Sequence, residues 1–175
     1  MSKIIDSVSL VRDPEQTFGM LSEVLAHVQD LKDFYPSFDV WFSERVLPGL
    51  STGDRSILVE YRQGGLAGLA ILKDDGMEKK LCCLRVLPGF QNVHGLGVRM
   101  FQRAFESLET ERPLLSVAEE RRPTFQRLFD YFDFELAEEY PSAYRIGRSE
   151  FAFNGCLYLP SAGRHESNGT VLAAR

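Results

Sequence analysis

The chain has 175 residues, 44% of them hydrophobic and 26% charged, which suits one soluble globular domain with a substantial apolar core. Its formal net charge of −5 argues against a broad nucleic-acid-binding surface, which would need clustered lysine and arginine. No apolar run approaches the roughly 20 residues that cross a bilayer, and the N-terminus lacks the apolar stretch of a signal peptide, so we expect a cytoplasmic protein without a membrane partner.

The cysteines predict neither a disulfide framework nor a metal site. Cys82 and Cys83 are adjacent in a predicted strand, so their side chains should point to opposite faces, and Cys156 lies far along the chain. No metal-ligand spacing is present. We expect structural thiols, with a reactive cysteine as the alternative.

The first third of the chain predicts a strand followed by two helices. Residues 4–11 have the pattern of a short strand, and Asp13-Pro14 is a helix-start signal. Apolar residues then recur at helical spacing up to Leu31. A second helix is expected over residues 39–47, ended by the proline and glycine that follow it.

The middle of the chain has the pattern of a β-meander. Strands are expected over residues 57–61, 66–72 and 80–87. The turns between them contain glycine and are too short for a helical crossover. The three strands should therefore run antiparallel.

The remaining pattern completes a single α+β domain. A helix is expected over 96–108, then a strand over 114–117, a helix over 125–132 and strands over 134–136 and 144–153. This order predicts a mixed central sheet of about six to seven strands flanked by about four helices. The domain should occupy residues 1–159, because residues 160–175 are polar and aperiodic and suggest a flexible tail.

The most informative stretch is LCCLRVLPGFQNVHGLGVRMFQRAFESL. A buried strand ends at Pro88, and Gly95 and Gly97 stand where a long helix begins. A helix start presents unpaired N–H groups and a positive dipole end, which favour a phosphate, and glycine lets that ligand approach the backbone. A tight turn without a ligand would leave the same pattern. The other common nucleotide-binding motifs are not matched.

Two spaced motifs resemble the GNAT superfamily of acyl-CoA-dependent N-acyltransferases. That family has a strand ending near a proline, then Arg/Gln-x-x-Gly-x-Gly/Ala and a helix. The segment NVHGLG at 92–97 matches it, with Asn92 where arginine or glutamine is usual. The segment SVAEERRPTFQRLFDYFDFEL is similar to the second signature, with Phe134 as its closing phenylalanine and Asp133 where glycine is usual. The element order resembles the family's fold over residues 4–155.

The resemblance implies acetyl-CoA or a related acyl-CoA as co-substrate, and the missing metal-ligand spacing gives no reason to expect a metal. The pantetheine arm would run along the strand that holds Leu84, Arg85 and Val86. The pyrophosphate would rest on the loop and helix start, which contain Asn92, Val93, His94, Gly95, Leu96, Gly97 and Val98. An amine acceptor, either a small molecule or a peptide, would enter from the opposite side of the splayed sheet and attack the thioester directly.

The general acid and base are less well defined. The family's frequent acid, a tyrosine five residues before the closing phenylalanine, is Phe129 here, so Tyr131 is the nearest candidate. A half-buried surface position is the other interpretation of Tyr131. Glu119 lies just beyond the strand at 114–117, where the family's sheet opens, and is the candidate base. The alternative is that Glu119 belongs to a solvated charge run.

Acceptor identity should depend on residues 31–53 and 137–148. The first segment is rich in aromatic side chains, which form core packing, an apolar wall of the acceptor site or a homodimer contact. Tyr144, Glu138 and Glu139 are candidates to line the acceptor pocket from the second. The sequence thus predicts an N-acyltransferase that transfers acetyl to a primary amine. The alternative is a GNAT-like module that binds acyl-CoA or a partner without turnover.

Overall fold

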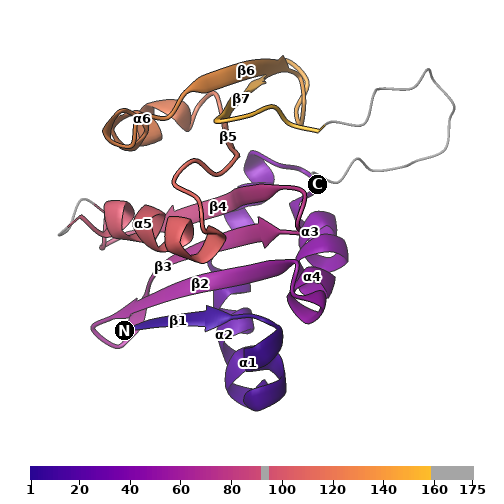
Figure 1. Cartoon of the computed structure of the whole chain (residues 1–175), viewed down its shortest axis with the longest axis vertical. Helices are drawn as coiled ribbons and strands as arrows, with labels where there is room; N and C mark the ends of the chain where they lie inside the picture. The colour runs from indigo at the N-terminus through magenta and orange to yellow at the C-terminus, as the bar shows by residue number, and fades with distance from the viewer. Residues whose placement is uncertain (92–94, 159–175) are drawn as a thin grey trace, which may run out of the picture.

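A computed structural model describes residues 1–91 and 95–158. Within them, two antiparallel sheets are arranged one above the other (Figure 1). The four-stranded sheet has the order β1-β2-β3-β4, with β1 at Ser2–Ile5, β2 at Arg55–Arg62, β3 at Gly65–Asp74 and β4 at Lys79–Val86. The three-stranded sheet has the order β5-β7-β6, with β5 at Leu115–Ala118, β6 at Leu136–Pro141 and β7 at Ser149–Phe153.

Helices cover both faces of the larger sheet (Figure 1). The helices on one face are α1 (Ser7–Arg12), α2 (Pro14–Ala26), η1 (Gln29–Asp33), α3 (Phe38–Trp41), η2 (Phe42–Val46) and α4 (Leu47–Thr52). On the opposite face lies α5 (Leu96–Leu108), and α6 (Arg122–Tyr131) packs with the smaller sheet. Both faces of β2 and β3 are therefore buried, and each contributes to two apolar clusters. This matches the predicted α+β fold, and the predicted meander of β2, β3 and β4 is confirmed.

The predicted strand over residues 4–11 is wrong beyond Ile5. Asp6 caps α1 instead, because its side chain accepts a hydrogen bond from the backbone N–H of Ser9 at 2.8 Å. The Ser9 hydroxyl accepts in return from the Asp6 N–H at 2.9 Å. This reciprocal cap stabilises a helix start in a segment whose apolar residues also suit a strand.

The predicted helix over 39–47 does not end at Pro48. A turn of π-helix, η2, leads directly into α4, and Pro48 occupies the first turn of α4, where no intrahelical N–H bond is lost. The helical segment ends at Gly53, which adopts a left-handed conformation with φ 89°. The strand predicted over 144–153 is also shorter, since β7 begins at Ser149.

The two sheets meet at a single parallel bridge between Lys80 of β4 and Leu114. The backbone N–H of Leu81 donates to the Leu114 carbonyl at 2.9 Å, and the N–H of Leu114 donates to the Lys79 carbonyl at 3.0 Å. No further bridge joins β4 to β5 within residues 1–91 and 95–158. The predicted mixed sheet is therefore joined at one point, beyond which β4 and β5 separate.

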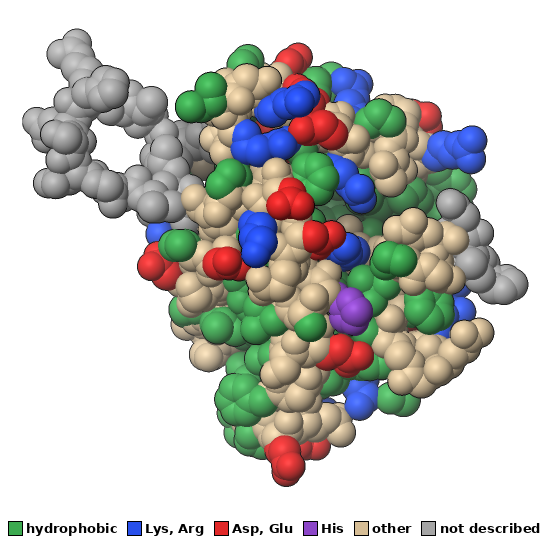
Figure 2. Space-filling view, turned by 180° about the vertical axis from the view of Figure 1, so that it is seen from behind, with side chains coloured by type: hydrophobic (Ala, Val, Ile, Leu, Met, Phe, Trp, Pro, Cys, Tyr) green, Lys and Arg blue, Asp and Glu red, His purple; other side chains and the backbone are tan. Residues whose placement is uncertain are grey.

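The rear surface of the molecule mixes acidic and basic side chains with apolar ones (Figure 2). Neither charge sign dominates this face, so it lacks the extended basic surface that nucleic acids require. Among the helices of the described ranges, none has the length and apolarity that a membrane span needs. The predicted tail at 160–175 lies outside the described residues.

We predict that alanine has opposite effects on folding stability at two glycines, Gly68 in the buried strand β3 and Gly19 in the exposed part of helix α2. A Cβ on Gly68 would lie 2.4 Å from Met100 Sδ and 3.1 Å from the Arg85 carbonyl oxygen, where α5 packs against β3. Gly68→Ala should lower the free energy of unfolding by about 1–3 kcal/mol. A Cβ on Gly19 in α2 meets nothing within 4 Å. Gly19→Ala should therefore raise the free energy of unfolding by about 0.5–1 kcal/mol. Urea denaturation measures both, and equal effects would contradict this account of the packing.

Candidate active site

A cavity of about 810 Å³ opens where β4 and β5 separate. Residues of β4, β5, α6, the start of α5 and the segment around η1 and α3 line it. The divergence of the strands after the Lys80–Leu114 bridge produces this space, because side chains from two separating strands cannot close it. The cavity thus lies between the two sheets and reaches the beginning of the long helix α5.

A β-bulge shapes the β4 side of the cavity. Ile71 pairs with Cys83 and Leu72 with Leu81, so Cys82 is an extra residue in β4. A bulge bends its strand and disrupts the ladder locally. The predicted residues Leu84, Arg85 and Val86 follow the bulge, and all three line the cavity.

The start of α5 forms one end of the cavity. Gly95 is the N-cap in a left-handed conformation with φ 63°, and no side chain caps the helix. Leu96, Gly97 and Val98 follow, and the geometry of a helix start leaves their N–H groups without intrahelical acceptors. All four of these residues line the cavity. The other predicted pyrophosphate-binding residues, Asn92, Val93 and His94, lie outside the described residues.

Gly97 has room for a side chain as far as packing is concerned. A Cβ there would meet the Leu128 side chain at 3.5 Å, an ordinary van der Waals contact. The backbone of Gly97 has no positive φ that would require glycine. Gly97 lines the cavity, so a larger or charged side chain there would add to the lining beside the N–H groups of the helix start.

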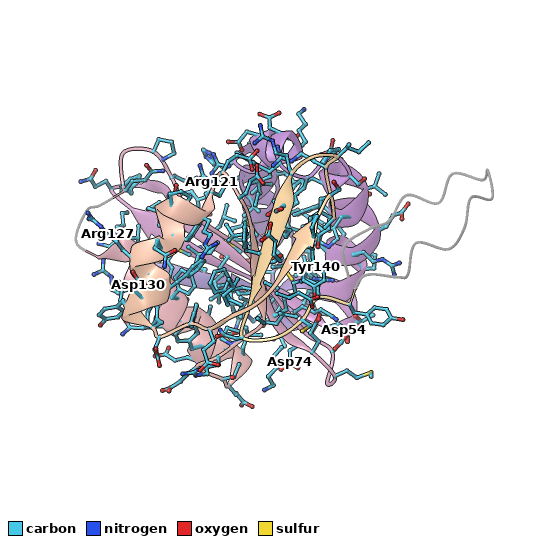
Figure 3. All side chains as sticks on the ribbon, turned by 90° about the horizontal axis from the view of Figure 1, so that it is seen from above. Asp54, Asp74, Arg121, Arg127, Asp130 and Tyr140 are labelled. Carbon is cyan, nitrogen blue, oxygen red and sulfur yellow. The ribbon has the colours of Figure 1, made fainter. Side chains whose placement is uncertain are left out.

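Two arginines add positive charge to the cavity. Arg121 at the start of α6 and Arg127 within it both line the space (Figure 3). The Arg121 guanidinium also lies 5.6 Å from the centroid of the Phe34 ring. Arginine donates to phosphate oxygens in a bidentate manner, so this side of the cavity suits an anionic ligand.

Aromatic side chains line the part of the cavity formed by η1 and α3. Phe34, Tyr35, Phe38 and Trp41 all contribute. Phe38 and Trp41 also belong to the core beneath, with exposed fractions of 4% and 8%. The predicted core packing is therefore confirmed for Phe38 and Trp41, and the segment also lines the cavity, whereas its role as a wall of an acceptor site stays a prediction. From the β6–β7 connection, Tyr144 completes the wall by packing edge-on against Tyr35, with ring centroids 5.4 Å apart.

Glu150 is a buried carboxylate beneath this wall. It lies on β7 with an exposed fraction of 3%, and it accepts a hydrogen bond from the Tyr35 hydroxyl at 3.1 Å. Burial raises its pKa to about 7, although Ser116, Tyr35 and Lys80 favour the charged form. Sequence reasoning missed Glu150, because a glutamate among alternating apolar residues is typical of the solvated face of a strand.

The two predicted catalytic residues lie outside the cavity. Glu119 pairs with Arg148 at 2.6 Å and accepts from the Ser149 N–H at 2.8 Å. These two contacts hold the pKa of Glu119 below its usual range, which disfavours a role as base. Tyr131 is 65% exposed on α6 and does not line the cavity. Phe129, at the position where the family often has tyrosine, is 2% exposed in the aromatic core.

Solved structures match the fold, whereas at the level of sequence no family model and no curated protein matches the chain. A spermidine N-acetyltransferase from Vibrio cholerae, solved with CoA and spermine, gives a TM-score of 0.57 at 16% identity and covers 87% of this chain and 92% of its own. The chain has the GNAT fold. Nourseothricin acetyltransferase gives a TM-score of 0.52 at 20% identity, covering 58% of this chain and 65% of its own.

A Desulfovibrio desulfuricans protein described as an acetyltransferase of the GNAT family gives a TM-score of 0.52 at 15% identity, covering 63% of this chain and 73% of its own. The predicted GNAT resemblance is thus confirmed for the fold. These neighbours share few residues with the chain, so they show its fold and not the roles of its side chains.

We predict that Glu150 makes folding stability fall as the pH rises. Its folded pKa of about 7 lies above the ordinary glutamate pKa of 4.5, so between these pH values the folded state holds a proton that the unfolded state releases. From pH 5 to pH 8 the free energy of unfolding of the wild type should therefore fall. The fall should be about 1–3 kcal/mol larger than that of Glu150→Gln over the same range. Urea denaturation at a series of pH values measures the difference. If the free energy of unfolding changes with pH in the same way in both proteins, the pKa of Glu150 is not raised by burial.

Proposed function

We propose that the chain is an N-acetyltransferase that transfers acetyl from acetyl-CoA directly to a primary amine. The observation that supports this most is the cavity between β4 and β5, with the helix start of α5 at one end. One end offers backbone N–H groups and the opposite side an aromatic wall, which suits two substrates meeting along the β4 edge. The neighbouring structures are acetyltransferases, and one of them holds CoA.

The residues of the cavity fit the parts of acetyl-CoA. The N–H groups of Leu96, Gly97 and Val98 can donate to the pyrophosphate oxygens. Arg127 can supply charge for the phosphates, whereas Arg121 lies against the Phe34 ring of the aromatic wall. Bound there, acetyl-CoA would supply an activated acetyl group on a thioester. The open edge of β4 would orient the pantetheine arm through its backbone, as the resemblance implies.

We further propose a small amine with one cationic group and an apolar body as acceptor. The aromatic wall offers apolar contact to such a body. Among the described residues that line the cavity, Asp30 is the acidic side chain, and both its oxygens bind Arg85. A polyamine carries additional ammonium groups that would find no available carboxylate there. The acceptor should therefore differ from spermidine, the substrate named for the Vibrio cholerae neighbour.

We predict that Gly97→Asp weakens acetyl-CoA binding at least 30-fold, or about 2 kcal/mol. The new carboxylate would occupy the space in front of the α5 N–H groups and repel the pyrophosphate. Isothermal titration with acetyl-CoA measures the effect. Gly97→Ala is the matched control, because its Cβ makes only an ordinary contact with Leu128. Wild-type binding by Gly97→Asp would rule out this position for the pyrophosphate.

We predict turnover of apolar monoamines in preference to polyamines. With acetyl-CoA, 2-phenylethylamine should release free CoA with a kcat/KM at least 10-fold above that for spermidine, since each unpaired ammonium is costly to bury. Chromatographic measurement of CoA and the acetylated amine checks this. A preference for spermidine would contradict the acceptor assignment. Binding of acetyl-CoA without release of CoA across a panel of amines would instead favour the non-catalytic module.

A further inference from the structure

We propose that Tyr35 and Glu150 form the proton-accepting pair of this active site, with Tyr35 as the catalytic residue that contacts the amine and Glu150 as the positioning residue behind it. This inference rests on the proposed function. A partly buried hydrogen bond between the two side chains carries it. A glutamate from β7 and a tyrosine from the segment after η1 are 115 residues apart and meet beneath the cavity.

The geometry orders the two groups from the cavity inward. Tyr35 lines the cavity, and Glu150, 3% exposed, does not. The Tyr35 hydroxyl donates to Glu150 Oε1 at 3.1 Å, which leaves its lone pairs free to accept from a ligand. An amine in the cavity can therefore reach Glu150 through Tyr35. Packing of Tyr144 against the Tyr35 ring holds this orientation.

The surroundings keep Glu150 able to exchange a proton. Lys80 and Ser116, which both line the cavity, approach Glu150 from β4 and β5, and Arg145 acts on it from the β6–β7 connection. These groups favour the carboxylate, while burial and the neighbouring Tyr144 and Tyr35 rings exclude water. The pKa of Glu150 settles at about 7, close to the value that suits a base at neutral pH. Burial beside Glu150 raises the pKa of Tyr35, so its hydroxyl stays protonated and can relay.

The location of the pair also suits the reaction. Lys80 and Ser116 flank the point where β4 and β5 begin to separate, next to the Cys82 bulge. Glu150 is hydrogen-bonded to Ser116 there, and the charge of Lys80 favours its carboxylate form. The aromatic wall of the proposed acceptor site contains Tyr35 itself. The amine would thus meet the hydroxyl on the side of the cavity opposite the helix start of α5.

The proton transfers balance as follows. The ammonium group of the acceptor gives one proton to the Tyr35 oxygen, while the Tyr35 hydroxyl proton moves to Glu150. The neutral nitrogen then bonds to the acetyl carbon of the thioester. The carbon–sulfur bond breaks, and the second nitrogen proton passes to the departing sulfur. The products are the acetylamine, free CoA and a proton that Glu150 releases to solvent. No redox partner is required.

The test measures kcat/KM against pH, with acetyl-CoA and the amine of the panel that is turned over fastest. In the wild type, kcat/KM should rise with pH through an inflection near 7. Tyr35→Phe and Glu150→Gln should each lower kcat/KM at pH 7 by about 100-fold. The inflection near 7 should disappear in Glu150→Gln, leaving only the titration of the amine. Glu150→Asp should restore part of the rate, and acetyl-CoA binding should stay within about threefold in all variants.

The control is Glu135→Gln, which removes an exposed carboxylate that pairs with Arg112 just before β6 and does not line the cavity. Its rate and pH profile should match the wild type. If Glu150→Gln and Tyr35→Phe keep the wild-type rate and inflection, the pair is not the proton acceptor. If they lose rate at every pH alike, with the inflection kept, their role is structural and the inference fails. Failure of the wild type to bind acetyl-CoA would overturn the proposed function itself. Binding of acetyl-CoA without turnover of any amine would likewise overturn the proposed transfer activity, in favour of a module that binds without catalysis. Turnover by the wild type, with its rate and pH profile kept in Tyr35→Phe and Glu150→Gln, would overturn this inference alone.

Discussion

The single parallel bridge between Lys80 and Leu114 is the constraint on which the site depends. It joins two sheets that are each antiparallel and complete in themselves. Because β4 and β5 run side by side only there, their edges diverge and leave the cavity between them. A fully paired sheet would fill this space with ladder hydrogen bonds. The bulge at Cys82 follows immediately and bends β4 where the separation starts.

Periodicity predicts those parts of the fold that depend on local pattern and long apolar faces. The meander follows from short turns, and α5 follows from an apolar face that buries Met100, Phe101 and Ala104 in the structure. The boundaries that were wrong depend on local hydrogen bonds. At Asp6 a reciprocal cap stabilises a helix where apolar content alone suits a strand. At Pro48 a π-helical turn changes the phase, so proline begins a helical segment that it was expected to end.

The two halves of the site differ in how much the sequence reveals. The proposed phosphate site is a helix start that depends on backbone groups, and glycine before a helix marks such a start locally, as at Gly95 and Gly97. Proton-transfer groups depend on long-range contact, which spacing along the chain does not encode. Tyr35 and Glu150 meet only because β7 inserts between β5 and β6 and the η1 segment packs across the cavity. The family pattern pointed instead to position 129, where phenylalanine packs into the aromatic core.

The burial of Glu150 is difficult to explain by stability alone. A carboxylate at 3% exposure loses hydration that one tyrosine hydroxyl and one serine replace only in part, and its raised pKa reports that imbalance. Glutamine would satisfy the same hydroxyl donors without a charge to bury. Glu119, by contrast, lies near the surface with an arginine partner and a backbone donor, where a carboxylate stabilises the fold at little cost. A group that is costly when ionised and adjacent to a substrate-sized cavity is therefore better explained by proton exchange than by packing.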